Sequence, residues 1–169
     1  MRNLLLDVVD LQGGIVSRRQ LRAWGVDHDA INVAAWYGRH LIRVRNGWFA
    51  RPSENREVLR AWRVGGRLTC ASALAFHDGV APGPVLHIEV PGWATQLRDP
   101  DNHRKRLGPE AAVVIHWARH PGPGTARAVT AEYAERVAAA CGVRSGAVTR
   151  SARRPSQAAA SSESASRIV

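Results

Sequence analysis

The side chains best suited to chemistry are two histidines in strand-like segments. His87 lies in VLHIEVP at residues 85–91, and His116 lies in AVVIHW at residues 112–117. The two imidazoles could face each other across a sheet, and Glu89 would share the strand face of His87 under regular pleating, which would supply three metal ligands. No spacing in the sequence requires a metal, so we expect these histidines to form structural hydrogen bonds. The sequence predicts no metal site and no cofactor.

The two cysteines offer no second route to a metal site. Cys70 and Cys141 lie far apart in the chain, without a CxxC pair or the usual His/Cys ligand spacing. They therefore predict neither a zinc ribbon nor a disulfide framework. This cysteine usage is typical of a reducing, cytoplasmic compartment.

Catalytic groups are not evident either. A hydrolytic nuclease needs paired carboxylates that hold a divalent ion, usually with a Lys. The single Lys, Lys105, lies beside Asp99 and Asp101 in a segment that we expect to be a solvated turn. Ser72 and His77 share a predicted helix but lie about 140° apart around its axis, so they cannot form a nucleophile and base pair directly. We expect no catalytic residues and no enzyme.

Composition excludes a membrane protein and favours a polyanionic partner. The chain of 169 residues is 45% hydrophobic, and no apolar run reaches the roughly 18 residues that a spanning helix requires. Asp7 and Asp10 interrupt the apolar opening, so we expect no secretory signal. The net charge is +10, and 23 of the 24 cationic residues are Arg, which suits phosphate contacts but also fits a GC-rich genome.

Three short helices are predicted before residue 40. The first covers Arg2 to Leu11 and ends at the following pair of glycines. The second begins at Ser17, which forms a capping-box pattern with Gln20, and ends near residue 25. The third runs from residue 28 to residue 37, with Asp27 as its N-cap.

A β-hairpin is predicted directly after these helices. Residues 41–45 and 48–50 are strand-like and flank Asn46-Gly47, a pair that favours a tight turn in which both residues accept positive φ. Three helices and a hairpin in this order predict a winged helix-turn-helix in residues 1–51.

The remaining segments complete an α+β fold. Helices at 54–64 and 69–77, strands at 85–91 and 112–117, and a charged loop at 98–108 predict a small helix-plus-sheet module in residues 52–120. Residues 121–143 are expected to be a linker with room for one helix, at 128–141. Residues 144–169 carry five Arg and one Glu, have few large apolar side chains, and are expected to form a disordered basic tail.

The third helix would probe the major groove. Ile31, Ala34 and Ala35 fit an inward stripe, which leaves the side chains at positions 28, 29, 32, 33 and 36 facing outward. An outward Asn can pair with adenine, and cationic side chains around the helix suit phosphates. The candidate DNA-binding residues are Ser17, Arg18, Arg19, His28, Asn32, Trp36, Arg39, Arg43 and Arg45.

Simpler structural roles are open for three of the outward residues. Asn32 also fits an ordinary solvated helix face, and Trp36 could pack against the hairpin. Asp29 would repel phosphate, although near a helix N-terminus it stabilises the helix dipole.

Several spaced blocks together resemble a known family. They are GGIVSRRQLRAWGVDHDAINVAAWYGRHLIRVRNGWFA, GGRLTCASALAFHDGV, VLHIEVP and VIHW. Across residues 10–118 the chain resembles actinobacterial proteins that carry an AbiEi-like type IV antitoxin N-terminal domain. The resemblance implies a winged-helix domain that binds promoter DNA and represses its own operon in a toxin–antitoxin or phage-defence setting.

The chain also departs from this family. Many relatives continue into a Vsr-like endonuclease domain of the PD-(D/E)xK type, and the residues after Cys141 do not resemble it. Relatives tend to carry more Arg at the positions of Asn32, Val33 and Trp36. We therefore expect no nuclease activity and weaker nonspecific DNA affinity through the third helix.

The sequence as a whole predicts an antitoxin-type transcriptional repressor. Its expected partners are double-stranded promoter or operator DNA, a second copy in a homodimer, and a cognate toxin. One alternative is a protein-interaction module whose winged domain docks a partner through Val33 and Trp36. A second alternative is a truncated remnant of a nuclease-fused protein.

Overall fold

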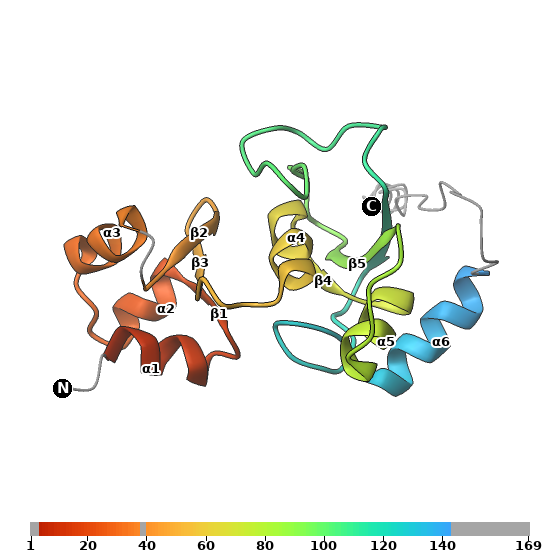
Figure 1. Ribbon diagram of the computed structural model, residues 1–169, viewed down its shortest axis with the longest axis horizontal. Coiled ribbons are helices and arrows are strands. Elements are labelled where there is room, and N and C mark those ends of the chain that lie inside the picture. The colour runs from red at the N-terminus through yellow and green to blue at the C-terminus, as the bar shows by residue number, and fades with distance from the viewer. Residues whose placement is uncertain (1–3, 38–39, 143–169) are drawn as a thin grey trace, which may run out of the picture.

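The computed structural model describes residues 4–37 and 40–142. These residues form a mixed α and β fold with six helices and two three-stranded sheets. Figure 1 shows two groups of elements side by side, α1–α3 with β1–β3 and α4–α6 with β4–β6. The basic tail predicted at 144–169 lies outside the described residues. Within the described part of the chain, no helix is long and apolar enough to cross a membrane.

The three N-terminal helices form where the capping residues predict them. They are α1 (Leu4–Leu11), α2 (Arg18–Ala23) and α3 (His28–Trp36). Ser17 Oγ accepts the backbone N–H of Gln20 at 3.1 Å, and Gln20 Oε1 accepts that of Ser17 at 2.8 Å, so the capping box is confirmed. The carboxylate of Asp27 likewise accepts two backbone N–H groups at the start of α3.

A small antiparallel sheet follows these helices. Its strands are β1 (Ile15–Ser17), β2 (Ile42–Arg45) and β3 (Trp48–Ala50), in the order β1-β3-β2. The hairpin is confirmed, but its turn differs from the predicted one, because Gly47 has a φ of 74° whereas Asn46 has no positive φ. The pairing register shifts between Arg43 and Arg45 instead, and this irregularity in β2 allows the strands to reverse with one left-handed residue.

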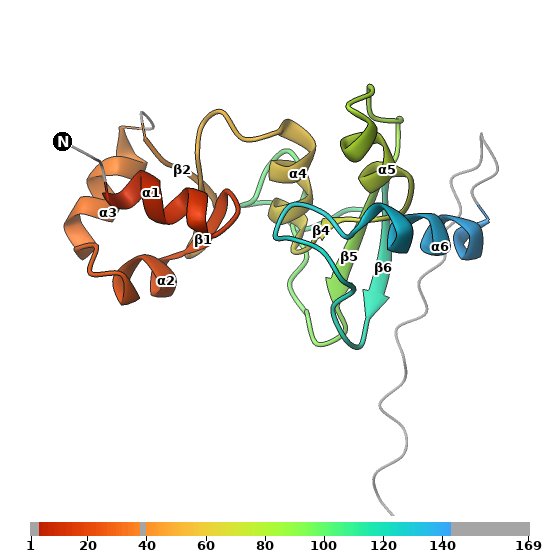
Figure 2. The ribbon, with the colours of Figure 1, turned by 90° about the horizontal axis from the view of Figure 1, so that it is seen from below.

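The second group is a sheet with helices on its two faces. It contains α4 (Arg56–Val64), β4 (Arg67–Leu68), α5 (Cys70–Asp78), β5 (Leu86–Pro91), β6 (Val113–Ala118) and α6 (Ala131–Cys141). In the order β4-β5-β6, the first pair is antiparallel and the second is parallel. Figure 2 shows α4 on one side of this sheet and α5 with α6 on the other. The predicted helices and both long strands are therefore present.

The two groups share part of their core. One buried cluster lies among the three N-terminal helices and includes Leu21, Ile31 and Phe49. The other cluster combines side chains of the first sheet, Ile15, Val44 and Ala50, with residues of α4 and β5. Since this cluster crosses the predicted boundary at residues 51 and 52, the hairpin is packed onto the second module.

Residues 121–142 belong to the second module. Ala128, Val129 and Ala134 lie in its buried cluster, and α6 packs against α5. Arg127 donates through Nε and Nη2 to the carboxylate of Glu54 at 3.0 and 2.8 Å. The helix predicted at 128–141 is confirmed, but the segment around it packs as part of the module and is not a linker.

The connection between β5 and β6 is long and irregular. Parallel strands are usually joined through a helix, whereas residues 92–112 contain none. Arg60 of α4 binds Asp101 at 3.1 Å, and Arg63 donates to the carbonyl of Pro100 at 3.3 Å. These contacts hold the loop over one end of α4. Long loops without secondary structure in compact domains are commonly functional.

The N-terminal core predicts a clear difference between two leucines. Leu21 is fully buried, whereas Leu11 is 68% exposed. We expect Leu21→Ala to lower the free energy of unfolding by about 2–5 kcal/mol, because it leaves a cavity among the helices. Leu11→Ala should change it by no more than about 0.5 kcal/mol. Urea unfolding followed by circular dichroism measures both, and equal losses would contradict this packing.

Candidate nucleic-acid interface

Helix α3 presents the face that the sequence predicts. Ile31 is fully buried, and Ala34 and Ala35 pack against the same cluster. The opposite face is formed by exposed side chains at positions 28, 29, 33 and 36 and by the half-buried Asn32. This exposed face contains no Arg or Lys and carries one acidic residue, Asp29, so the groups on it that could contact bases are His28 and neutral side chains such as Asn32.

Asn32 is held in place by Arg18 of α2. Arg18 Nη1 donates to Asn32 Oδ1 at 3.0 Å, and its guanidinium lies 5.2 Å from the ring centroid of the buried Phe49. A bidentate contact with adenine uses both the carbonyl oxygen and the amide nitrogen of Asn. The carbonyl oxygen has a second lone pair, and the amide still has its two donors. Arg18 therefore orients Asn32 without using all of its hydrogen-bonding groups.

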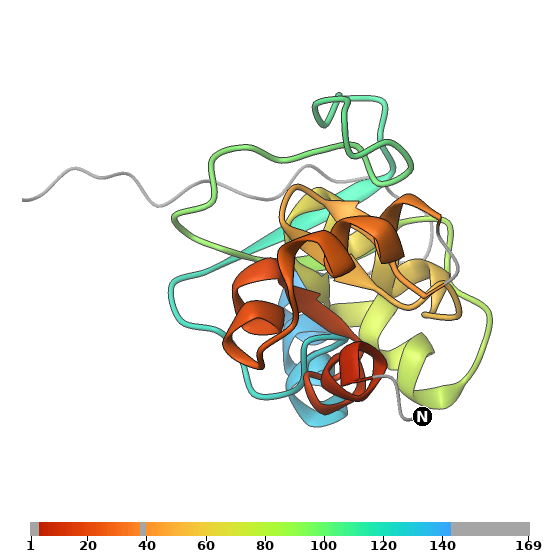
Figure 3. The ribbon, with the colours of Figure 1, turned by 90° about the vertical axis from the view of Figure 1, so that its left-hand side faces the viewer.

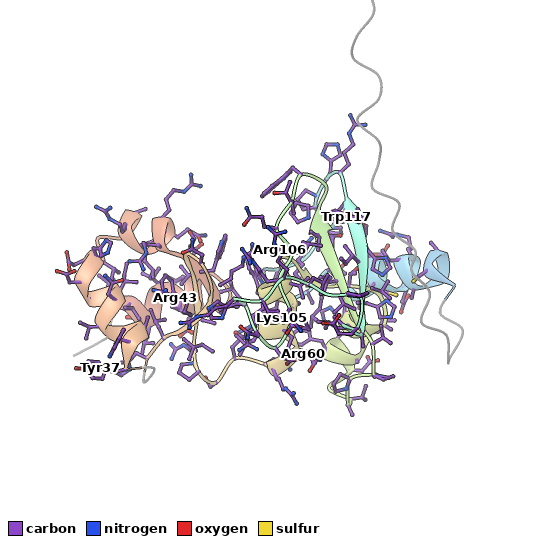
Figure 4. All side chains as sticks on the ribbon, turned by 90° about the horizontal axis from the view of Figure 1, so that it is seen from above. Tyr37, Arg43, Arg60, Lys105, Arg106 and Trp117 are labelled. Atoms are coloured by element: carbon purple, nitrogen blue, oxygen red, sulfur yellow. The ribbon has the colours of Figure 1, made fainter. Side chains whose placement is uncertain are left out.

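An apolar stripe follows the outer face of α3. Val33, Trp36 and Tyr37 are 56%, 87% and 72% exposed. Trp36 does not pack against the hairpin, so that alternative role is wrong. In Figure 4, Tyr37 lies at the outer end of the molecule, away from Arg43. The stripe is available to a partner.

The cationic candidates differ in what they can contact. Arg19 and Arg43 are exposed and suited to phosphates. Arg45 is half-buried next to Gly65, and the pKa of its guanidinium is lowered by burial and by the charge of Arg98. Arg45 therefore lies at the junction of the two modules.

For two of the predicted DNA-binding residues, Ser17 and Arg39, the structure does not indicate a phosphate contact. The hydroxyl of Ser17 both accepts from Gln20 N and donates to Gln20 Oε1, so it serves the helix cap. Arg39 lies outside the described residues.

A positive cluster joins the hairpin, α4 and the loop between β5 and β6. At its centre, the pKa of His103 is held below its usual value, first by burial and then by the charges of Arg104, Arg63, Arg43 and Arg98. These guanidiniums come from three separate parts of the chain. In Figure 4, Arg60, Lys105 and Arg106 lie in the second group of elements, and Arg43 lies in the first group.

Acidic residues of the loop are occupied by internal contacts. Asp99 Oδ1 accepts the backbone N–H groups of Asp101 and Asn102 at 2.9 Å, which confirms the predicted turn. Asp101 pairs with Arg60, and Glu110 pairs with Lys105 at 3.0 Å. Arg104 and Arg106 are exposed, and among the described residues their guanidiniums have no hydrogen-bond partner.

Sequence reasoning missed the contribution of this loop. The composite basic surface, defined here as Arg43, Arg63, Arg98, Arg104, Lys105 and Arg106, includes four loop residues that were predicted only to be exposed. The run RDPDNHRKR at 98–106 was the available signal. The net charge of this segment is small. The surface is cationic because the carboxylates of the loop are occupied by contacts within the protein.

The side chains that could bind a metal or act in catalysis lie together on the second sheet, away from the composite basic surface. His87 Nδ1 and His116 Nε2 are 3.3 Å apart, which confirms that they face each other. Glu89 does not join them, because its carboxylate accepts from Arg67 and from the backbone of Gly122. Glu89 therefore does not supply the third ligand that regular pleating would have allowed.

Two cysteines take that place. Cys70, His87, His116 and Cys141 form one group that could hold a metal ion. Spacing in the sequence did not indicate this group, because the chain brings together residues far apart in sequence.

The predicted hydroxyl and imidazole on α5 have separate partners. Ser72 Oγ accepts the backbone N–H of His87 at 2.8 Å. His77 Nε2 lies 2.7 Å from the carbonyl oxygen of Val129. Both side chains therefore fix α5 to neighbouring segments.

No known family model matches the chain, and no curated protein is significantly similar to it.

The bridge between α2 and α3 predicts a stability difference between two arginines. Arg18→Ala removes the hydrogen bond to Asn32 and the contact with Phe49, so we expect a loss of about 1–2 kcal/mol in the free energy of unfolding. Arg22→Ala, an exposed position on the same helix, should change it by no more than about 0.5 kcal/mol. Denaturant unfolding of both variants provides the comparison, and indistinguishable values would show that the bridge is not stabilising.

Proposed function

We propose that this protein binds double-stranded DNA as a winged helix-turn-helix protein. In this proposal α3 enters the major groove, while the β2–β3 hairpin and the loop between β5 and β6 contact phosphates beside it. The observation that supports the proposal is that these three parts all lie toward one side of the molecule, away from α1 and α6 (Figures 1 and 3).

The distribution of charge supports different roles for α3 and for the composite basic surface. Arginine contacts with phosphates supply affinity and fix the register, whereas neutral groups at base edges supply specificity. The composite basic surface provides the cations, and α3 provides Asn32 and His28 near its N-terminal half. Asp27 is used as the N-cap of α3, so its carboxylate serves the helix.

The regulatory role rests on the family resemblance. It implies an antitoxin-type repressor that controls its own operon in a type IV toxin–antitoxin or phage-defence system. A homodimer would match the two-fold symmetry of a palindromic operator. The promoter DNA upstream of the gene is therefore the first ligand to test.

A second candidate function is docking of a partner protein through α3. The exposed stripe of Val33, Trp36 and Tyr37 favours it, because large exposed aromatic residues are enriched at protein interfaces. A cognate toxin is the expected partner in this case.

The composite basic surface predicts salt-dependent DNA binding that specific arginines support. We expect the full chain to bind its own upstream duplex better than a scrambled duplex, with affinity falling steeply as salt rises. Arg43→Ala and Arg104→Ala should each weaken both complexes and reduce the slope of log K against log salt by about 1. Fluorescence anisotropy across a salt series measures these quantities.

A matched control and a helix variant separate the two functions. Arg136→Ala removes an exposed arginine on α6 and should leave DNA binding unchanged. Asn32→Ala should reduce the preference for the upstream duplex. Absence of DNA binding, or equal losses with Arg136→Ala and Arg43→Ala, would contradict the DNA proposal. Toxin binding that Trp36→Ala abolishes would then support the docking function.

His103 predicts a pH dependence of DNA affinity. In the free protein its pKa lies below the usual value, first because of burial and then because of the charges of Arg104, Arg63, Arg43 and Arg98, and bound phosphates would offset the charge contribution. The complex would therefore hold its proton more tightly than the free protein. Affinity should rise as pH falls from the usual His pKa, about 6.5, toward the lowered value, by at most about tenfold per pH unit.

Comparison of two histidine variants tests this linkage. His103→Asn should flatten the pH profile between pH 7.5 and pH 5.5, whereas His120→Asn, at an exposed position outside the composite basic surface, should retain it. Anisotropy titrations at constant ionic strength supply the profile. An unchanged profile in His103→Asn would exclude His103 as the source of the pH dependence.

A further inference from the structure

Four potential metal ligands converge between the second sheet and its two outer helices. Cys70 begins α5, His87 lies in β5, His116 lies in β6 and Cys141 ends α6. One ligand atom from each of these residues lies within 4.8 Å of all the others. Each residue comes from a different element, so the group exists only in the folded chain.

The distances are close to those of a tetrahedral site. Zinc–nitrogen bonds of about 2.0–2.1 Å and zinc–sulfur bonds of about 2.3 Å place neighbouring ligand atoms roughly 3.3–3.8 Å apart in a tetrahedron. His87 Nδ1 and His116 Nε2 are 3.3 Å apart, and His116 Nε2 lies 4.0 Å from Cys141 Sγ. All four ligand atoms lie within 4.8 Å of one another, so the ligands would draw closer together around a bound ion.

The chemistry of the donors selects the metal. The group contains two thiols and two imidazoles and no carboxylate. Tetrahedral sites with two sulfur and two nitrogen ligands are typical of zinc, whereas magnesium and calcium prefer oxygen. Four protein ligands leave no open position for a reactive water, which is the arrangement of a structural site.

Burial keeps the imidazoles in the form that binds metal. Burial, followed by the neighbouring His87, lowers the pKa of His116 to about 4, so its ring is neutral at pH 7. Burial also raises the pKa of Cys70 to about 11. Zinc binding would release the thiol proton, because the thiolate is the form that binds the metal.

The backbone at Cys70 provides an independent observation. Its φ of 51° makes it the one non-glycine residue with positive φ in the described part of the chain. Such a conformation costs about 1–3 kcal/mol and persists where the surroundings require it, often at functional sites. The preceding Thr69 is buried, and its Oγ1 has no hydrogen-bond partner among the described residues. The chain is thus constrained at the point where it places Cys70 against β5.

We propose that Cys70, His87, His116 and Cys141 bind one zinc ion that fixes the end of α6 and the edge strand β6 to the second module. Within α6 only Ala134 is fully buried, and the last turn of the helix, with Cys141, is only partly buried. A zinc ion at Cys141 would attach its last turn to α5 and to both parallel strands. This site is separate from the composite basic surface and does not depend on the proposed DNA binding.

Metal analysis of the full chain is the direct test. Protein purified under reducing conditions with added Zn²⁺, and then dialysed, should contain one zinc per chain by mass spectrometry of the metal. Replacement by Co²⁺ should give the visible absorption of a tetrahedral site and a thiolate-to-cobalt charge-transfer band. A chelator should lower the Tm of the wild-type protein.

Variants identify the ligands. Cys141→Ser and His116→Asn should lose stoichiometric zinc and the cobalt spectrum, whereas His120→Asn, an exposed histidine outside the group, should retain both. Cys141→Ser should also have a Tm that no longer responds to a chelator. Because the wild-type cobalt spectrum needs no variant, misfolding of a substituted chain does not prevent the test.

Two results would overturn the proposal. The first is reduced wild-type protein that retains no zinc and gives no tetrahedral cobalt spectrum. The second is a Cys70–Cys141 disulfide in the purified protein, with no metal uptake after reduction. Neither measurement uses DNA, so failure here is distinguishable from failure of the proposed function.

Discussion

Burial of the first sheet against helix α4 is the contact on which the arrangement of this protein depends. Ile15, Val44 and Ala50 of that sheet lie in the same apolar cluster as residues of α4 and β5. Burial of such side chains contributes about 25 cal/mol per Å² of apolar surface, and close packing allows few alternative orientations. The same helix holds the loop between β5 and β6 through Arg60 and Arg63. The core around α4 therefore fixes the positions of both the hairpin and the loop. The composite basic surface, which both modules contribute to, can then present a defined pattern of charge.

That charge pattern arises because the acidic side chains of the loop are occupied by internal contacts, whereas some of its arginines are not. In the loop, the carboxylates of Asp99, Asp101 and Glu110 accept internal contacts, which order a segment that has no secondary structure. The guanidiniums of Arg104 and Arg106 are left exposed to solvent. Exposed ion pairs of this kind add little stability, so their main effect is to shape the loop and its field. Helix α3, by contrast, presents no cation on its exposed face, which suits a helix that reads bases while other segments bind phosphates.

Local signals in the sequence predicted most of the helices and the hairpin. Ser17 with Gln20, and Asp27, satisfy backbone donors within a few residues, so their structural role is visible without a fold. The strands β1 and β4 were not predicted, because they are two or three residues long and exist through pairing with distant segments. The turn at Asn46 was misjudged because the shift in register belongs to the strand pair. The cationic surface of the loop likewise depends on contacts between distant residues, because its carboxylates bind partners within the fold.

The group of two cysteines and two histidines could not be predicted from spacing, since each ligand lies on a separate element. Spacing rules describe sites built on single turns, whereas here the parallel pairing of β5 and β6 brings the histidines together. This pairing also explains why a cross-link would be useful. Strand β6 is half-buried along its whole length, lies at the edge of the sheet, and is joined to β5 without a helical crossover. Parallel pairs are somewhat weaker per residue than antiparallel ones, and an edge strand has a partner on one side only. A metal bond that joins β5, β6 and both outer helices at one point would offset that weakness at the half-buried edge of the sheet.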